Sequence, residues 1–161
     1  MKKAIYAAAA VAMLGLSACT GNTCDSKGCK VDRSDDKVYT GVLPAADCDG
    51  IRYTLKLDYD DDNNYTDGDY DLVQTYIGSD STSMTGYKDI SSFKSKGDFT
   101  VIKGEGANAG KTFLKLVEDA PKGKQGDTMY FIVDSDSAVT MTNADFEMPP
   151  SGLNYTLRLV K

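Results

Sequence analysis

The chain contains 161 residues, carries a formal net charge of −6 and has no histidine. Without histidine it lacks the usual general base, the commonest metal ligand and any Ser-His or Cys-His nucleophile, so its composition argues against an enzyme. Its acidic balance also argues against nucleic acid or an anionic lipid surface as an electrostatic partner.

Residues 1–18 have the organisation of a lipoprotein signal peptide. Two lysines precede an apolar segment over residues 4–16, which is shorter than the ~20 residues that a spanning helix needs. The segment ends in Leu16-Ser17-Ala18-Cys19, a lipobox, so we predict cleavage before Cys19 and acylation of Cys19. An ordinary signal peptide or a short membrane anchor is the alternative. Thr20, in place of the aspartate that retains enteric lipoproteins in the inner membrane, favours a lipid anchor in the outer membrane.

Residues 19–36 contain almost no apolar side chains and are predicted to form a flexible tether between the lipid and the folded domain. Once Cys19 is acylated, three cysteines remain in an oxidising compartment, namely Cys24, Cys29 and Cys48. Cys24 and Cys29 can close a small loop as a disulfide, and pairing of either one with Cys48 is the alternative. The same three thiols are candidate ligands for Cu(I), which favours sulfur.

The folded domain, predicted over residues 37–161, opens with two alternating runs joined by a tight polar turn. In the second run Ile51, Tyr53, Leu55 and Leu57 share one face, as in a half-buried strand. Pro44 cannot donate to a strand ladder, and Asp47 and Gly50 tolerate the dihedral angles of a turn. We therefore predict that the chain reverses direction here.

The next segment, residues 58–69, is rich in aspartate and matches part of a calcium-binding loop. Asn63 stands where such a loop needs glycine, and no helical pattern flanks the segment. A solvated hairpin turn is the favoured interpretation.

Several further stretches have the composition of strands and are separated by turn residues. The stretch 65–78 is predicted to be broken or bulged near Gly68, and the very apolar stretch 128–133 is predicted to be buried on both faces. The others are residues 98–102, 112–117, 138–141 and 153–159. No stretch of the domain keeps a helical period, so the predicted fold class is all-β, a small antiparallel meander barrel.

The turn region also carries a motif of a known family. Tyr39, Gly41, Leu43, Pro44, Asp47, Cys48, Gly50 and Ile51 follow a spacing that resembles the N-terminal domain of the NlpE family of copper-homeostasis and adhesion lipoproteins. The resemblance continues at residues 93–99, 111–116 and 153–157, and so covers nearly all of the predicted domain. Where the family carries Cys-x-x-Cys after Leu-Pro, this chain has Ala45 in place of the first cysteine.

The resemblance implies a barrel reminiscent of a shortened lipocalin, in a non-enzymatic lipoprotein of the cell envelope. It also implies a role in copper tolerance or in sensing envelope stress or surfaces through an envelope protein partner. One alternative is a lipocalin-like module that binds a small ligand at a mouth ringed by Tyr59, Tyr65, Tyr70 and Tyr76. Another is a surface lipoprotein that binds a protein through its acidic hairpin at residues 58–71.

Overall fold

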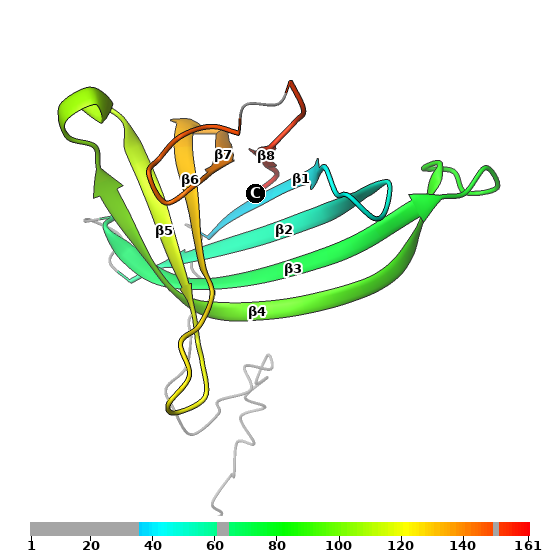
Figure 1. Cartoon of the computed structure of the whole chain (residues 1–161), viewed down its shortest axis with the longest axis horizontal. Helices are drawn as coiled ribbons and strands as arrows, with labels where there is room; N and C mark the ends of the chain where they lie inside the picture. Colours follow the sequence, from blue (N-terminus) through cyan, green and yellow to red (C-terminus); the bar gives the residue numbers. More distant parts are fainter. Residues whose placement is uncertain (1–35, 61–64, 150–151) are drawn as a thin grey trace, which may run out of the picture. The chain divides into compact units, whose positions relative to one another are not determined.

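The computed structural model describes residues 36–60, 65–149 and 152–161. These residues form eight strands and one turn of 3-10 helix, Gly106–Asn108 (Figure 1). The strands are β1 (Lys37–Leu43), β2 (Gly50–Tyr59), β3 (Asp67–Ser79), β4 (Tyr87–Lys103), β5 (Thr112–Glu118), β6 (Thr128–Ser135), β7 (Ala138–Thr142) and β8 (Thr156–Leu159). No helix in these described ranges is long and apolar enough to cross a membrane.

The strands form a closed barrel in which each strand pairs antiparallel with the next. β8 closes the barrel on β1, with Tyr39 opposite Leu159 and Thr40 opposite Arg158. Two backbone hydrogen bonds of 2.7 Å extend this seam. The Val38 N–H donates to the Lys161 carbonyl oxygen, and the Val160 N–H donates to the Val38 carbonyl oxygen. The predicted all-β meander barrel is therefore confirmed.

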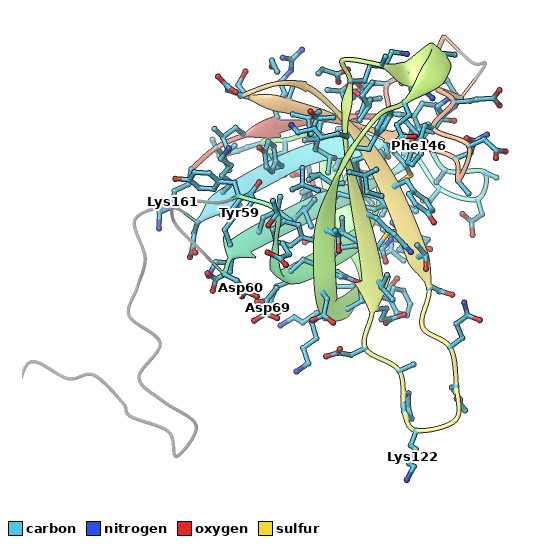
Figure 2. All side chains as sticks on the ribbon, turned by 90° about the vertical axis from the view of Figure 1, so that its left-hand side faces the viewer. Tyr59, Asp60, Asp69, Lys122, Phe146 and Lys161 are labelled. Carbon is cyan, nitrogen blue, oxygen red and sulfur yellow. The ribbon has the colours of Figure 1, made fainter. Side chains whose placement is uncertain are left out.

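A meander places alternate connections at opposite ends of the barrel. The connections after β1, β3, β5 and β7 lie at one end, here called the Cys48 end. Those after β2, β4 and β6 lie at the other, here called the Tyr59 end. Figure 2 labels Lys122 at the tip of the β5–β6 connection, which projects away from the barrel, and Tyr59 on a different side of the molecule.

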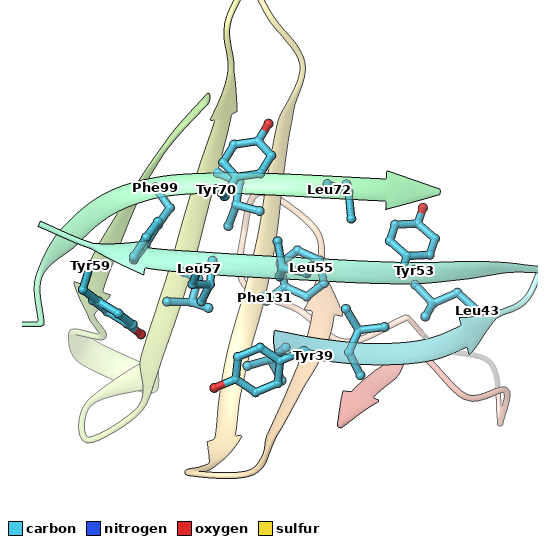
Figure 3. Close-up of a cluster of buried hydrophobic side chains, with 14 residues drawn as sticks. Tyr39, Leu43, Tyr53, Leu55, Leu57, Tyr59, Tyr70, Leu72, Phe99 and Phe131 are labelled. Atoms are coloured by element: carbon cyan, nitrogen blue, oxygen red, sulfur yellow. The ribbon is translucent and has the colours of Figure 1, made fainter. Parts of the chain in front are cut away.

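The core lies inside the barrel and follows the alternation of each strand. In β2, alternate residues from Tyr53 to Tyr59 are buried, as the sequence predicts. Register then places their neighbours on the same inner face, such as Leu72 opposite Leu55 and Phe131 opposite Leu114. Figure 3 shows the resulting cluster, in which Leu55, Leu57, Leu116, Phe131, Val139 and Leu157 have no exposed surface.

Glycines occur where two backbones come closest. A Cβ on Gly41 would lie 2.6 Å from the Thr156 carbonyl oxygen, across the β1–β8 seam. A Cβ on Gly68 would lie only 2.1 Å from the Asp58 carbonyl oxygen. Gly68 pairs regularly with Tyr59 and Phe99, and the irregularity in β3 falls at Tyr76/Ile77. The predicted bulge near Gly68 is therefore wrong, because the glycine serves close strand packing instead.

Two other strand predictions are also corrected. β4 has 17 residues and begins at Tyr87, whereas the sequence predicts a strand only over residues 98–102. The missed half, residues 87–96, is exposed on both faces except at half-buried Ser95, and so it lacks the alternation by which strands are recognised. β6 is not buried on both faces: only Phe131 is fully buried, and Tyr130 contacts Phe146 of the β7–β8 connection at 5.7 Å between ring centroids.

Candidate functional site

Cys48 lies in the loop that connects β1 to β2 and is half-buried. Its Sγ donates a hydrogen bond to the Gly50 carbonyl oxygen at 3.1 Å. The neighbouring Asp49 carboxylate accepts hydrogen bonds from the Ser79 N–H at 2.5 Å and from the Ser79 Oγ at 2.9 Å. These bonds hold the loop against the end of β3, so the thiol occupies a defined position.

The structure explains the other residues of the turn motif by packing. Leu43 is buried in the core. A Cβ on Gly50 would lie 2.7 Å from Val42 Cγ1 and 3.1 Å from the Leu43 carbonyl oxygen, so glycine lets β2 begin close beside β1. Pro44 is half-buried and Asp47 is exposed. The motif therefore specifies how β1 turns into β2 and does not by itself assemble a set of ligands.

Among the described residues, no three Cys, Asp or Glu side chains lie close enough to hold a metal ion. Cys48 is the free cysteine of this part of the chain, and Ala45 supplies no second sulfur in its loop. A single thiol does not fit Cu(I), which takes several sulfur ligands. The other predicted residues, Cys19, Cys24 and Cys29, lie outside the described ranges.

The acidic segment after β2 forms a hairpin, as predicted. Asp58 lies opposite Asp69 in the β2–β3 ladder, and the Asp60 N–H donates to the Asp67 carbonyl oxygen at 3.1 Å. The tip, residues 61–64, lies outside the described ranges.

The Cys48 end contains a cavity of about 550 Å³. Its walls combine rings and thioethers with polar side chains, and most of these residues face the barrel interior by register. They are Tyr53, Gln74, Phe93, Lys94, Ser95, Glu118, Asp127, Thr128, Met129 and Met141. Gln74 Nε2 donates to Tyr53 Oη at 2.9 Å, which fixes one side of the cavity. Buried Leu55 and Phe131 close the barrel beyond it.

Two hydroxyl groups near this cavity, those of Tyr70 and Ser95, are buried without satisfied hydrogen bonds. Tyr70 is 2% exposed, and its Oη approaches Ser95 Oγ, but neither oxygen makes a hydrogen bond of good geometry with the described residues. Figure 3 shows the Tyr70 hydroxyl pointing away from the centre of the core cluster. Burial raises the pKa of Tyr70, and the nearby carboxylates of Glu118, Asp119 and Asp127 raise it further. The hydroxyls therefore lie in a negative field and are free to bind a donor.

The Tyr59 end contains a second cavity, of about 630 Å³. Tyr59 and Tyr65 line it with ring centroids 5.1 Å apart, and Lys37 Nζ lies 5.7 Å from the Tyr59 centroid. The four tyrosines named for the alternative ligand-binding module do not share one mouth. Tyr70 belongs to the core, and Tyr76 contacts Phe93 near the Cys48 end, because the register of β3 distributes its tyrosines along the barrel.

Tyr39 is also buried near the Tyr59 end. Burial raises the pKa of Tyr39 to about 12, with smaller contributions from Tyr59 and Asp136. Burial likewise raises the pKa values of Tyr53 and Tyr59. These phenols stay protonated near neutral pH and act as hydrogen-bonding and packing groups.

The family model described as the NlpE N-terminal domain matches residues 39–152, which is more than half of the chain. The chain belongs to the NlpE N-terminal domain family. The match begins at Tyr39, so it includes the turn motif, and it extends through β7 into the following connection. No curated protein and no solved structure matches the chain. The family assignment makes this an NlpE-like envelope protein with a barrel of eight strands.

The sequence did not reveal the cavity at the Cys48 end. Gln74, Ser95 and Glu118 occupy inward-facing positions where apolar residues are expected. A polar residue at such a position, as Gln74 between Leu72 and Tyr76, is the one available signal. It can be interpreted only once the register is known.

Proposed function

We propose that this NlpE-like protein is a non-enzymatic lipoprotein, anchored in the outer membrane through Cys19, that works by contact with another envelope protein. The family match carries this proposal. The lipobox at residues 16–19 supports the anchor, and the absence of histidine from the whole sequence supports a role other than catalysis. In the family, such contacts serve the sensing of envelope stress or of surfaces.

Metabolic labelling with a palmitate analogue tests the anchor. The wild-type chain should incorporate label and fractionate with the outer membrane, and inhibition of the lipoprotein signal peptidase should leave a longer precursor. Cys19→Ser should remove the label, while the control Cys24→Ser should keep it. Label that persists in Cys19→Ser would show that the lipid is attached elsewhere or that the lipobox is not used.

Copper tolerance is the second candidate function; the cysteine of the turn motif suggests it, although this one thiol does not make a Cu(I) site. This thiol lies in the loop where the family carries its cysteine pair, and it is half-buried. Because the loop holds one sulfur, any Cu(I) site would need Cys24 and Cys29 as its principal ligands. Cys48 would then either supply a third sulfur ligand or not bind the ion.

A competitive Cu(I) titration under reducing conditions separates these possibilities. The protein would be the chain from residue 19 onward with Cys19→Ser, compared with Cys48→Ser and with a Cys24→Ser/Cys29→Ser double variant. Tight one-to-one binding that is lost in the double variant would support the copper role. Binding no stronger than that of the competing chelator would reject it and leave the barrel to act through a protein.

A further inference from the structure

One edge of β4 is unpaired near the Cys48 end. β3 pairs with β4 from Tyr87 to Thr100, but β5 pairs with it only from Gly97 onward. The last bond on the β5 side runs from the Asp119 N–H to the Lys96 carbonyl oxygen. No described strand pairs with that side of residues 87–95, and in Figure 1 this half of β4 forms the lower border of the sheet.

The direction of the free backbone groups follows from that last bond. The N–H and C=O of one residue in an antiparallel strand point to the same side, and the next residue points to the other. Since the Lys96 carbonyl faces β5, the N–H and C=O of Lys94 and Ser92 face the unpaired side. Such an edge is a template for another strand.

The unpaired edge borders the cavity at the Cys48 end. Phe93 and Ser95 of β4 form one wall, while Met129 of β6 and Met141 of β7 form another. Phe93 faces inward by register and is nevertheless 57% exposed, because no strand covers this half of β4. A strand added to the edge would direct alternate side chains towards this apolar wall.

The charges around the cavity specify which side chain it would take. Two carboxylates, Glu118 and Asp127, and one ammonium group, Lys94, line it, so the lining is acidic on balance. None of the three forms an ion pair within the described ranges. The Tyr70 and Ser95 hydroxyls beside them lack hydrogen-bond partners among the described residues. A long basic side chain would supply both the positive charge and the N–H donors.

The outward-facing positions of the same edge include two lysines, one of which, Lys96, lies 4.0 Å from Asp119. Lys94 and Lys96 lie opposite the outward-facing residues Val73 and Asp71 of β3. A bound strand would therefore combine a basic residue facing inward with acidic or polar residues facing outward. A second copy of this chain fits poorly, because pairing of two such edges would bring their lysines together.

We propose that β4 binds an extended segment of a partner protein as an added strand along residues 88–95, and that an arginine or lysine of this segment enters the cavity between Glu118 and Asp127. This inference rests on the proposed function only in taking the partner to be a protein. Lipidation and copper binding are measured in separate experiments. Either of them can fail while strand addition holds, and strand addition can fail while they hold.

The test is an NMR titration of the chain from residue 19 onward with Cys19→Ser. The probe is the capped peptide Thr-Val-Glu-Arg-Glu-Val-Thr, added to about 5 mM so that millimolar Kd values are detected. One control peptide carries citrulline for arginine, which keeps the shape and removes the charge. Another is N-methylated at alternate amides and cannot pair with a strand edge.

Four protein variants complete the design. Lys94→Pro removes a backbone donor that faces the free edge and leaves the bonds to β3 in place, while Lys94→Gln controls for the lost charge. Glu118→Gln/Asp127→Asn removes the cavity charges. Glu105→Gln/Asp145→Asn makes the same change in net charge at two exposed sites outside the cavity. Amide spectra of each variant confirm that the barrel is folded.

We expect saturable shifts in residues 88–95, 118 and 127–129, with the citrulline and N-methylated peptides binding about tenfold more weakly. Lys94→Pro should abolish binding, and Glu118→Gln/Asp127→Asn should make the arginine and citrulline peptides equal. The inference is overturned if no saturable shift occurs, if shifts map to the Tyr59 end, or if Lys94→Pro binds like Lys94→Gln. Equal binding of the arginine and citrulline peptides to the wild-type chain would also overturn it.

Discussion

Replacing Gly41 with alanine should weaken the seam that closes the barrel. The new Cβ would lie 2.6 Å from the Thr156 carbonyl oxygen and 3.0 Å from Leu157 Cδ2. The first contact is with backbone, which cannot move aside without disturbing β8. Overpacking of this kind costs about 1–3 kcal/mol, and the smaller entropy of unfolded alanine offsets about 0.4–1 kcal/mol of that. We expect a net loss of about 1–2 kcal/mol in the free energy of unfolding.

Thermal and urea unfolding followed by circular dichroism measure this loss. For a domain of this size it corresponds to a fall in Tm of about 3–8 °C. Gly152→Ala is the matched control, because no atom lies within 4 Å of the added Cβ. It should leave stability unchanged or raise it slightly. If Gly41→Ala and Gly152→Ala unfold at the same temperature, the β1–β8 seam does not constrain this position and the reasoning is refuted.

Three further predictions use the same unfolding assays. Phe131→Ala should cost about 3–5 kcal/mol because its ring is fully buried, and similar losses for the exposed Phe93→Ala would contradict this description of the core. Folding raises the pKa of Tyr39 from 10.0 to about 12, so its contribution to stability is present below pH 10 and is lost between pH 10 and about 12. Between pH 10 and about 12, urea titrations should show a smaller loss of unfolding free energy for Tyr39→Phe than for the wild-type chain. Equal losses in the two proteins would disprove the assignment. Asp49→Ala should cost about 1–2 kcal/mol because it removes two hydrogen bonds to β3, whereas Asp47→Ala, at an exposed position, should have little effect.

The sequence is sufficient to predict the strands whose two faces differ. In β2 the apolar side chains alternate with Arg52, Thr54 and Lys56, and the structure buries the apolar ones. The turn motif was equally readable, because proline and glycine restrict the backbone wherever they occur. Both signals depend on residues that are neighbours along the chain, so no tertiary information is needed to interpret them.

The first half of β4 shows where this local signal ends. Residues 87–96 are held by backbone hydrogen bonds to β3 and bury almost no side chain, so their composition resembles that of a loop. The tyrosines show the same limit. Three of them have similar sequence surroundings but different places in the barrel. Tyr59 lines the cavity at the Tyr59 end, Tyr70 lies in the core, and Tyr76 lies near the Cys48 end.

The amino-acid sequence by itself thus determined the all-β class, the reversal between β1 and β2 and the family, and it predicts the lipid anchor on Cys19. Only the tertiary structure decided which strands close the barrel, which side chains meet at each end, and where an edge is left unpaired. The physical reason is that strand period is a property of adjacent residues. Register and closure instead depend on the packing of eight strands that are distant in sequence.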